Sequence, residues 1–262
     1  MPQKNKVVIP AQRVANLVLD MATYLLASGA HCGRVNRNIN RIANVWNFDI
    51  HLQLTFKGVL TTVKDRQNLT NVVTRYKEAP PHSIHLNIIS EISALSWRVH
   101  DDKLSIENVE KEYAKIKELK PYGTLLVTVA IAFSCAGLCL FSSGDYLNAI
   151  VAFAAAFCGY LARTFLAKLS FNAMIYIGVA AFVTTFITGI GAKFGVGRAP
   201  EAAIATAVLY LIPGVPLINS VIDLIEGYIT SSMNRMMFSG FTLLCIAAGM
   251  TLCITLIGIN HF

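Results

Sequence analysis

The order of hydrophobic and polar residues in the first part of the chain follows a helical period in four segments. Residues 14–25 and 35–46 each place an apolar side chain every three or four positions, as an amphipathic helix does. The same spacing returns over residues 89–99 and 106–116, and the last of these segments starts behind Ser105, a favourable N-cap residue. We therefore expect four helices in this part of the chain.

Between the second and third of these helices the hydrophobic period changes to two. Residues 48–56 alternate between apolar and polar side chains, which is typical of a strand with one buried and one solvated face. Gly58 permits a turn, and the segments 59–63 and 69–76 predict two further strands. Residues 1–121 are therefore expected to form an α+β domain in which helices flank a small, mostly antiparallel sheet.

Beyond residue 121 the hydrophobic residues run continuously. Five mainly apolar segments follow, most of them close to the length of about 20 residues that a membrane-spanning helix requires. They are residues 123–141, 147–162, 171–192, 202–222 and 238–259. We expect residues 122–262 to form an all-α membrane domain of about five transmembrane helices, with the lipid bilayer around them.

Charged residues divide the chain at the same position. The sequence is 55 % hydrophobic and only 14 % charged, whereas a soluble domain carries roughly 25 % charged residues. Residues 1–121 hold 17 of the 22 Lys and Arg residues and 11 of the 15 Asp and Glu residues. The basic residues are scattered singly, which favours an anionic membrane surface over nucleic acid as the reason for the positive excess.

Basic residues next to the apolar segments predict the orientation. With the polar part in the cytoplasm, Arg163, Lys168 and Arg235 fall on the inner side, as the positive-inside rule requires. Lys193 and Arg198 then fall outside, against the rule. The majority predicts a multi-pass membrane protein with its N-terminus in the cytoplasm.

Few residues of the polar part suggest catalysis or metal binding. No GxSxG, phosphate-binding glycine loop or HExxH pattern is present, and five of the six cysteines lie in apolar runs, where Cys acts as a small hydrophobe. His31 and Cys32 are adjacent, but neighbouring residues on a helix do not face each other, so a helix-end role is expected. We expect no enzyme activity, no metal and no cofactor.

One apolar segment contains its own helix breakers. The sequence LIPGVPLINSVI, residues 211–222, holds Pro213, Gly214 and Pro216. Pro213 removes a backbone donor and Pro216 suits the first turn of a new helix, so we expect a transmembrane helix broken into two halves at PGVP. The N-terminus of the second half would offer N–H groups to an anionic group such as a substrate carboxylate.

Polar residues beyond the break share one predicted helix face, namely Asn219, Asp223, Glu226 and Thr230. An Asp at membrane depth costs roughly 2.5–3.5 kcal/mol unless it is paired or hydrated. No Lys or Arg lies within ten residues of Asp223, so its cationic partner is either distant in sequence or the substrate. Asp223 is a candidate to bind an ammonium group or to carry a coupling proton. The alternative is a simple proline kink with both carboxylates at the inner interface.

The segment PGVPLINSVIDLIEGYITSSMNR resembles the threonine/serine exporter family of the ThrE type, in its short, split form, the YjjP-like subunits. A second stretch, GAHCGRVNRNINRIA, is similar to an N-terminal family motif, although His31, Cys32 and Asn36 replace residues of that motif, including both of its acids. The resemblance covers roughly residues 10–258. The residues that match the two motifs are Pro213, Gly214, Pro216, Asn219, Asp223, Gly227 and Arg235 in the first and Gly29, Arg34 and Val35 in the second.

The resemblance implies a subunit of a secondary-active exporter of small polar metabolites, foremost threonine- or serine-type amino acids, in the bacterial cytoplasmic membrane. Longer family members carry a second set of spans in the same chain. A separately encoded membrane subunit that resembles this missing half is therefore the expected partner, in an oligomer that moves a small-molecule substrate.

Three alternatives remain open at this stage. A dicarboxylate substrate would need two cationic or donor sites, so that Arg235 or Arg34 would matter more than Asp223. The chain could instead be a regulatory or scaffolding subunit whose partner forms the pathway. A membrane-anchored hydrolase with its chemistry in residues 1–121 is the third alternative.

Overall fold

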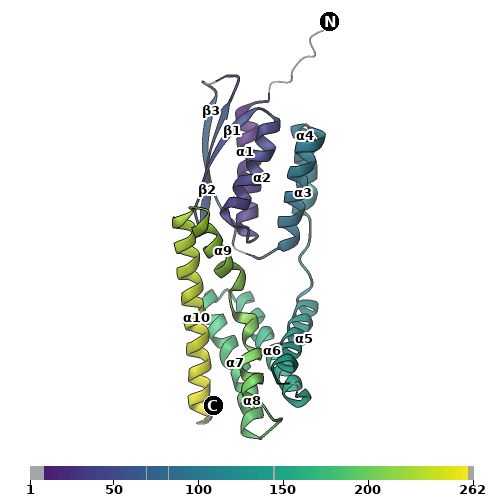
Figure 1. Ribbon diagram of the computed structural model, residues 1–262, viewed down its shortest axis with the longest axis vertical. Helices are drawn as coiled ribbons and strands as arrows, with labels where there is room; N and C mark the ends of the chain where they lie inside the picture. The colour runs from purple at the N-terminus through teal and green to yellow at the C-terminus, as the bar shows by residue number, and fades with distance from the viewer. Residues whose placement is uncertain (1–8, 69, 82, 144, 259–262) are drawn as a thin grey trace. The chain divides into compact units, whose positions relative to one another are not determined.

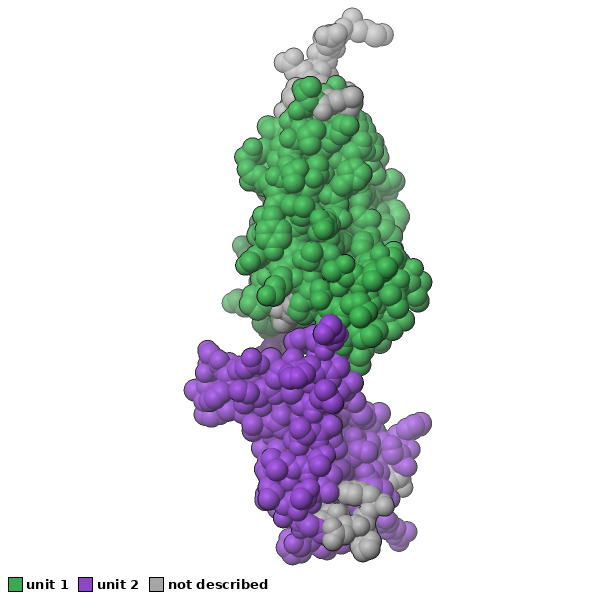
Figure 2. All heavy atoms as spheres, turned by 90° about the vertical axis from the view of Figure 1, so that its left-hand side faces the viewer, with its two compact units in different colours: residues 1–121, 215–236 green, residues 122–214, 237–262 purple. Residues whose placement is uncertain are grey.

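The computed structural model describes residues 9–68, 70–81, 83–143 and 145–258, which form two compact units. Unit 1 comprises Met1–Pro121 and Val215–Met236, whereas unit 2 comprises Tyr122–Gly214 and Met237–Phe262 (Figure 2). The segment that follows the PGVP sequence therefore belongs to the same compact unit as the N-terminal part of the chain.

The N-terminal part of unit 1 contains four helices (Figure 1), α1 (Ala11–Ala27), α2 (Cys32–Val45), α3 (Leu86–Asp102) and α4 (Ile106–Lys117). Ser105 is the N-cap residue of α4, as its sequence predicts. The apolar stripes of the helices form one buried core, whose largest fully buried side chains include Met21, Leu25, Ile39, Ile42, Ile92, Leu95 and Ile106. Burial of these stripes supplies the main driving force for the packing of the helices.

The sheet of unit 1 has the strand order β1 (Phe48–Leu54), β2 (Gly58–Asp65) and β3 (Val72–Glu78), and both strand pairs are antiparallel. Phe48, Ile50 and Leu54 are buried as the two-residue alternation predicts. The predicted third strand began at residue 69, which lies outside the described residues, whereas β3 begins at Val72 and extends to Glu78. Helix α1 packs on β2 and β3 and covers one face of the sheet.

Helix α1 ends in a tight turn that aims the start of α2. Gly29 has a φ angle of +95°, a conformation that Gly adopts without the steric cost of a Cβ atom. The N–H of Gly29 donates to the carbonyl of Leu26, and the N–H of Ala30 donates to that of Leu25. The chain then enters α2 through His31, the N-cap residue, whose side chain accepts a hydrogen bond from the N–H of Arg34.

The described residues of unit 2 include the long apolar helices α5 (Thr124–Ser143), α6 (Tyr146–Lys168) and α7 (Ala173–Lys193), which are joined by short connections. The short helix α8 (Pro200–Ala207) and the 3-10 turn η1 (Leu209–Leu211) follow. Small residues let α6 and α7 approach closely. A Cβ atom on Gly159 would lie 2.0 Å from Oγ1 of Thr184, which itself hydrogen-bonds the hydroxyl of Tyr210 at 3.0 Å. This packing is typical of helices in a membrane.

Four described helices are long and apolar enough to cross a membrane, namely α5, α6, α7 and α10 (Ile229–Ile257). A fifth candidate is the pair formed by Pro200–Leu211 and α9 (Gly214–Ile225), which is bent by 63° at a short break. The chain is therefore mostly helical, with four to five candidate spans and a small three-stranded sheet, as the hydrophobic pattern predicts.

Candidate functional site

Helix α9 and the first turns of α10 supply one half of the candidate site. Gly214 is the first residue of α9, Pro213 precedes it and Pro216 lies in its first turn, where the missing proline N–H costs no helical hydrogen bond. Gly227, with a φ angle of +86°, separates α9 from α10. Because α9 ends at Ile225, the prediction that Thr230 continues the face of Asn219 and Asp223 is wrong: Thr230 belongs to α10.

Asp223 is fully buried and its carboxylate has partners on three sides. The backbone N–H of Cys32 donates to Oδ1 at 2.7 Å. Oδ2 lies 3.2 Å from Nε of Arg235 and accepts a long hydrogen bond of 3.4 Å from the hydroxyl of Ser231. Since Cys32 is the first residue of α2, the carboxylate sits at the positive end of that helix dipole, which favours an anion there.

Arg235 is the cation that balances Asp223, and only 4 % of it is exposed. Its Nη2 donates to the carbonyl of Ala30 at 2.9 Å, while its Nε faces Asp223 without making an aligned hydrogen bond to the described residues. Loss of one partner from such a buried pair leaves an uncompensated charge, which costs about 3–5 kcal/mol. The pair is therefore important for folding as well as for any chemistry.

The turn between α1 and α2 is held from the same direction by a third side chain. Nδ2 of Asn219 donates to the carbonyl of Gly29 at 2.7 Å. Three side chains thus bind three backbone groups of one turn. Asn219 binds the carbonyl of Gly29, Arg235 binds the carbonyl of Ala30, and Asp223 binds the amide of Cys32. We call these six residues the ion-pair site.

Glu226 forms a second, more exposed layer beside this site. Its Oε1 accepts from Nη1 of Arg37 at 2.8 Å, and its Oε2 lies 3.1 Å from Nδ1 of His31. The hydrogen bond from Arg37 is the main reason that the pKa of Glu226 lies below its ordinary value, and His31 adds to the effect against the opposing cost of burial. Gly33 makes this approach possible, because a Cβ atom there would lie 1.8 Å from Oε2.

Nδ1 of His31 has two competing partners. It caps α2 by accepting from the N–H of Arg34 at 3.3 Å, which requires an unprotonated nitrogen. The same atom faces Oε2 of Glu226, to which it can donate only when it carries a proton. The tautomer of His31 therefore decides whether it caps the helix or holds Glu226.

Cys32 does not act as a nucleophile in this arrangement. Its thiol is buried and donates to the hydroxyl of Ser231 at 3.1 Å, and burial raises its pKa to about 12. Since the thiolate is the reactive form, a thiol of this kind is inert at neutral pH. His31 and Cys32 stand at the N-cap and first position of α2, as the helix-end interpretation predicts.

The described residues bring His31, Asp223 and Glu226 close enough to be considered as metal ligands, with candidate atoms within 4.8 Å of one another. However, Arg235 and Arg37 already neutralise the two carboxylates. A divalent cation would have to displace both guanidinium groups or add positive charge to a balanced cluster. We therefore assign no metal or cofactor to this cluster.

The structure brings some of the predicted site residues together and leaves others apart. The ion-pair site contains Gly29, Asn219, Asp223 and Arg235. The exposed Arg34 contributes only its backbone N–H, which donates to the cap residue His31. The remaining predicted residues define helix ends, namely Pro213, Gly214, Pro216 and Gly227. Sequence reasoning missed Ser231, Arg37, Gly33 and the amide of Cys32, although the polar run SSMNR before a long apolar segment was an available signal.

The amino-acid sequence matches a known family of membrane proteins. The family model ThrE, described as "Putative threonine/serine exporter", matches residues 16–257. The chain belongs to the ThrE family. As several long apolar helices also indicate, it is a multi-pass membrane protein of a family of exporters.

Curated relatives of this ThrE-family chain carry two kinds of name. Proteins from Klebsiella aerogenes and Escherichia coli K12, each named "Probable succinate transporter subunit YjjP", are 28 % and 27 % identical to it over 250 residues. Each alignment covers 94 % of this chain and 95 % or 96 % of the relative. A "Probable threonine/serine exporter" from Mycobacterium tuberculosis is 21 % identical over 231 residues, which are 86 % of this chain but 42 % of that protein. No solved structure matches the chain.

Proposed function

We propose that this ThrE-family chain is one subunit of a secondary-active exporter of small dicarboxylates, which works with a separately encoded membrane subunit. One observation carries the proposal: Arg235 and the first amide of α2 jointly hold a buried carboxylate, that of Asp223. An arginine beside a helix N-terminus is an arrangement that binds anions. The substrate carboxylate is proposed to use the same donors as Asp223.

The occupied state of Asp223 favours a dicarboxylate over an amino acid. A bound amino acid needs an acidic partner for its ammonium group, and Asp223 was the candidate. Arg235 already neutralises Asp223, so that carboxylate is not available to a second cation. A dicarboxylate requires only cationic and donor groups. Arg37 and Arg235 both lie in this part of unit 1, and each would exchange its present partner, Glu226 or Asp223, for a substrate carboxylate.

The proposed cycle exchanges Asp223 for the substrate at Arg235. A proton on Asp223 removes its negative charge and frees the guanidinium group. A substrate carboxylate then restores the balance of charge, and its departure outward allows Asp223 to return. Because Arg235 can balance one carboxylate but not two, proton binding by Asp223 and binding of a substrate carboxylate at Arg235 are coupled.

Subunit character and membrane placement complete the proposal. The relatives that match this chain over almost their whole length are named transporter subunits. The relative named as an exporter is more than twice as long as the region aligned here, which leaves room for a second set of spans. We place residues 1–121 as a cytoplasmic α+β domain, with the bent pair of Pro200–Leu211 and α9 as a broken span of the bacterial inner membrane.

Export of threonine or serine is the second candidate function. The description of the family model and the name of the M. tuberculosis relative favour it. In that case the carboxylate of the amino acid would bind Arg235. Its ammonium group would need an acidic residue outside the ion-pair site, supplied by the partner subunit.

The decisive experiment is efflux of preloaded radiolabelled succinate from cells that express this chain with its candidate partner. Threonine runs in parallel. The variants are Arg235→Gln, Asp223→Asn and the double variant, which is neutral at both positions. Arg98→Gln is the matched control, because Arg98 forms an exposed ion pair with Glu112.

We expect Arg235→Gln to lower succinate efflux at least tenfold and the double variant to regain membrane levels without regaining efflux. Normal efflux by the double variant would show that Arg235 merely neutralises Asp223 and would overturn the proposed site. Efflux of threonine without succinate would replace the dicarboxylate proposal with the second candidate function. Normal transport by all three variants would favour a regulatory or scaffolding role.

A further inference from the structure

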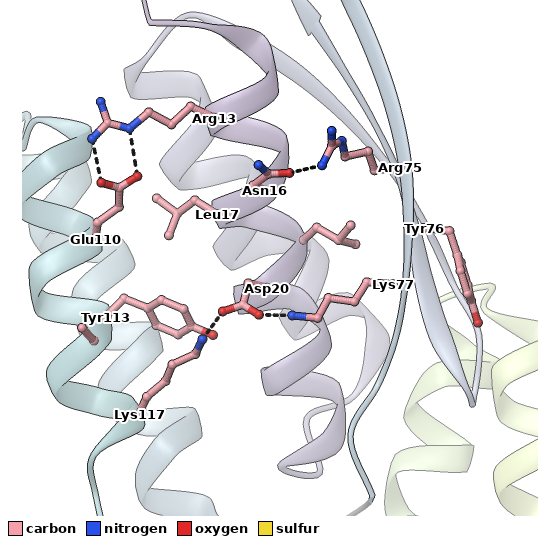
Figure 3. A pocket seen from close by; sticks show the side chains of 12 residues that line it. Arg13, Asn16, Leu17, Asp20, Arg75, Tyr76, Lys77, Glu110, Tyr113 and Lys117 are labelled. Atoms are coloured by element: carbon pink, nitrogen blue, oxygen red, sulfur yellow. Dashed lines mark hydrogen bonds and ion pairs between the residues drawn. The ribbon is translucent and has the colours of Figure 1, made fainter.

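Unit 1 has a second charged site, built from other residues than the ion-pair site. A pocket of about 810 Å³ opens between α1, β3 and α4 (Figure 3). Its lining includes the basic residues Arg13, Arg75, Lys77 and Lys117 but only two acids, Asp20 and Glu110. The pocket therefore carries an excess of two positive charges.

One of these two positive charges arises from Lys77 and Lys117, which share the single carboxylate of Asp20. Both Lys77 and Lys117 donate to its carboxylate, one to each oxygen. Burial opposes ionisation of Asp20, but the two lysines outweigh it and hold its pKa below the ordinary value. Asp20 is thus ionised at neutral pH, and the trio has a formal net charge of +1.

Arg75 supplies the second charge. Its Nη1 donates to Oδ1 of Asn16 at 2.6 Å, and the described residues give its guanidinium group no carboxylate partner. Arg13, in contrast, is fully engaged by Glu107 and Glu110. Arg75 and Lys77 are two positions apart on β3, so their Cα atoms are separated by about 6.6 Å on the same face of the strand.

Tyr113 provides a second, independent observation at this pocket. Its side chain is only 4 % exposed and lines the pocket, with the ring directed toward Asp20 (Figure 3). Its hydroxyl makes no well-aligned hydrogen bond to the described residues. It lies near the Asp20 carboxylate, and burial together with this carboxylate raises the pKa of Tyr113. A buried hydroxyl without a partner costs about 1–3 kcal/mol, and a ligand oxygen at this position would remove that cost.

We propose that this pocket binds a small dianion, specifically a C4 dicarboxylate, with one carboxylate on Arg75 and the other between Lys117 and the Tyr113 hydroxyl. The choice of ligand class rests on the proposed function, since a site of this kind lets unit 1 sense the metabolite that the transporter exports. Two separated cationic centres favour a dianion over a monocarboxylate.

The test is calorimetric titration of succinate into the full chain in detergent at constant ionic strength, with propionate as the monoanionic control. The background is the Asp223→Asn/Arg235→Gln double variant, which removes the proposed transport site. We expect one saturable site for succinate and none for propionate. Arg75→Gln should weaken binding at least tenfold and Tyr113→Phe about threefold, whereas Arg66→Gln, an exposed arginine paired with Asp49, should have no effect.

Absence of saturable succinate binding, or unchanged binding by Arg75→Gln, would overturn the proposal. Equal binding of propionate would overturn the two-centre arrangement. Should the double variant not fold, wild type and the Arg75→Gln single variant are titrated in its place. Wild type should then show two classes of succinate site, and the single variant should keep one of them. Binding in this pocket together with failed succinate efflux would leave the pocket intact and refute only the proposed function.

Discussion

Unit 1 contains two aspartates that are held by basic side chains, in opposite surroundings. Asp223 is fully buried and pairs with one arginine that is itself almost completely buried. Asp20 is partly exposed and pairs with two lysines whose side chains are almost half exposed. Water can replace a lost partner at Asp20 but not at Asp223, so the same pairing has a different energetic weight at the two sites.

The buried aspartate pairs with arginine, whereas the partly exposed aspartate pairs with lysines. Arginine can bind a carboxylate and a carbonyl at once with a rigid, planar group, as Arg235 does with Asp223 and Ala30. Lysine is a strongly hydrated point charge on a flexible stem and suits a site that remains wet. The buried site is therefore built to hold one defined geometry, whereas the open pocket leaves room for its charges to rearrange around a ligand.

The largest effect is expected from Arg235→Gln. This substitution leaves the buried carboxylate of Asp223 without its cation and should destabilise the protein by about 3–5 kcal/mol. Adding Asp223→Asn should restore most of the loss, because no buried charge then remains. Thermal unfolding of the purified variants in detergent measures both effects. An unchanged midpoint for the single variant would mean that water or lipid headgroups reach the pair.

An intermediate effect is expected from Glu226→Gln, since Glu226 is only partly buried between Arg37 and His31. We expect a loss of about 0.5 kcal/mol at neutral pH. The pKa of Glu226 is lowered in the folded state, so its contribution is present above the pKa of the unfolded chain and is lost as pH falls through the folded value.

Unfolding midpoints of wild type and Glu226→Gln should therefore differ at pH 7 and converge in acid. Arg66→Gln serves as a control for the loss of an exposed pair. A difference that grows as the pH falls would contradict the assigned sign and indicate that Glu226 does not stabilise the folded state through its charge.

The smallest effect is expected from Lys117→Gln. Lys77 still pairs with Asp20 in this variant, and the solvent compensates part of the lost interaction, so stability should change by no more than about 0.5 kcal/mol. A much larger loss in the same unfolding assay would show that the pocket is as strictly organised as the buried site.

Periodicity predicted the elements well because each helix and strand buries one face of its own local sequence. The four helices of the N-terminal part, the three strands and the candidate spans all follow from spacing that is visible within 20 residues. The spacing of Asn219 and Asp223 likewise predicted that both side chains point the same way, and both are buried.

The partners of these side chains could not be predicted in the same way. Arg235 lies on the next helix, beyond the turn at Gly227, and helical spacing does not extend across such a turn. The amide of Cys32 is 191 positions from Asp223 and is a backbone group, which leaves no mark in the sequence. The pocket around Asp20 depends on charges from three elements, and no single segment reveals their proximity.

The long separation between Cys32 and Asp223 has a consequence for biosynthesis. A ribosome releases the turn at Gly29 well before it makes Asn219, Asp223 and Arg235, and helices α5, α6 and α7 come in between. Until then the carbonyls and the amide of that turn lack the side chains that close it. Unit 1 can therefore be completed only after α5, α6 and α7 have been synthesised, and a nascent chain that stops before residue 215 lacks the side chains that bind this turn.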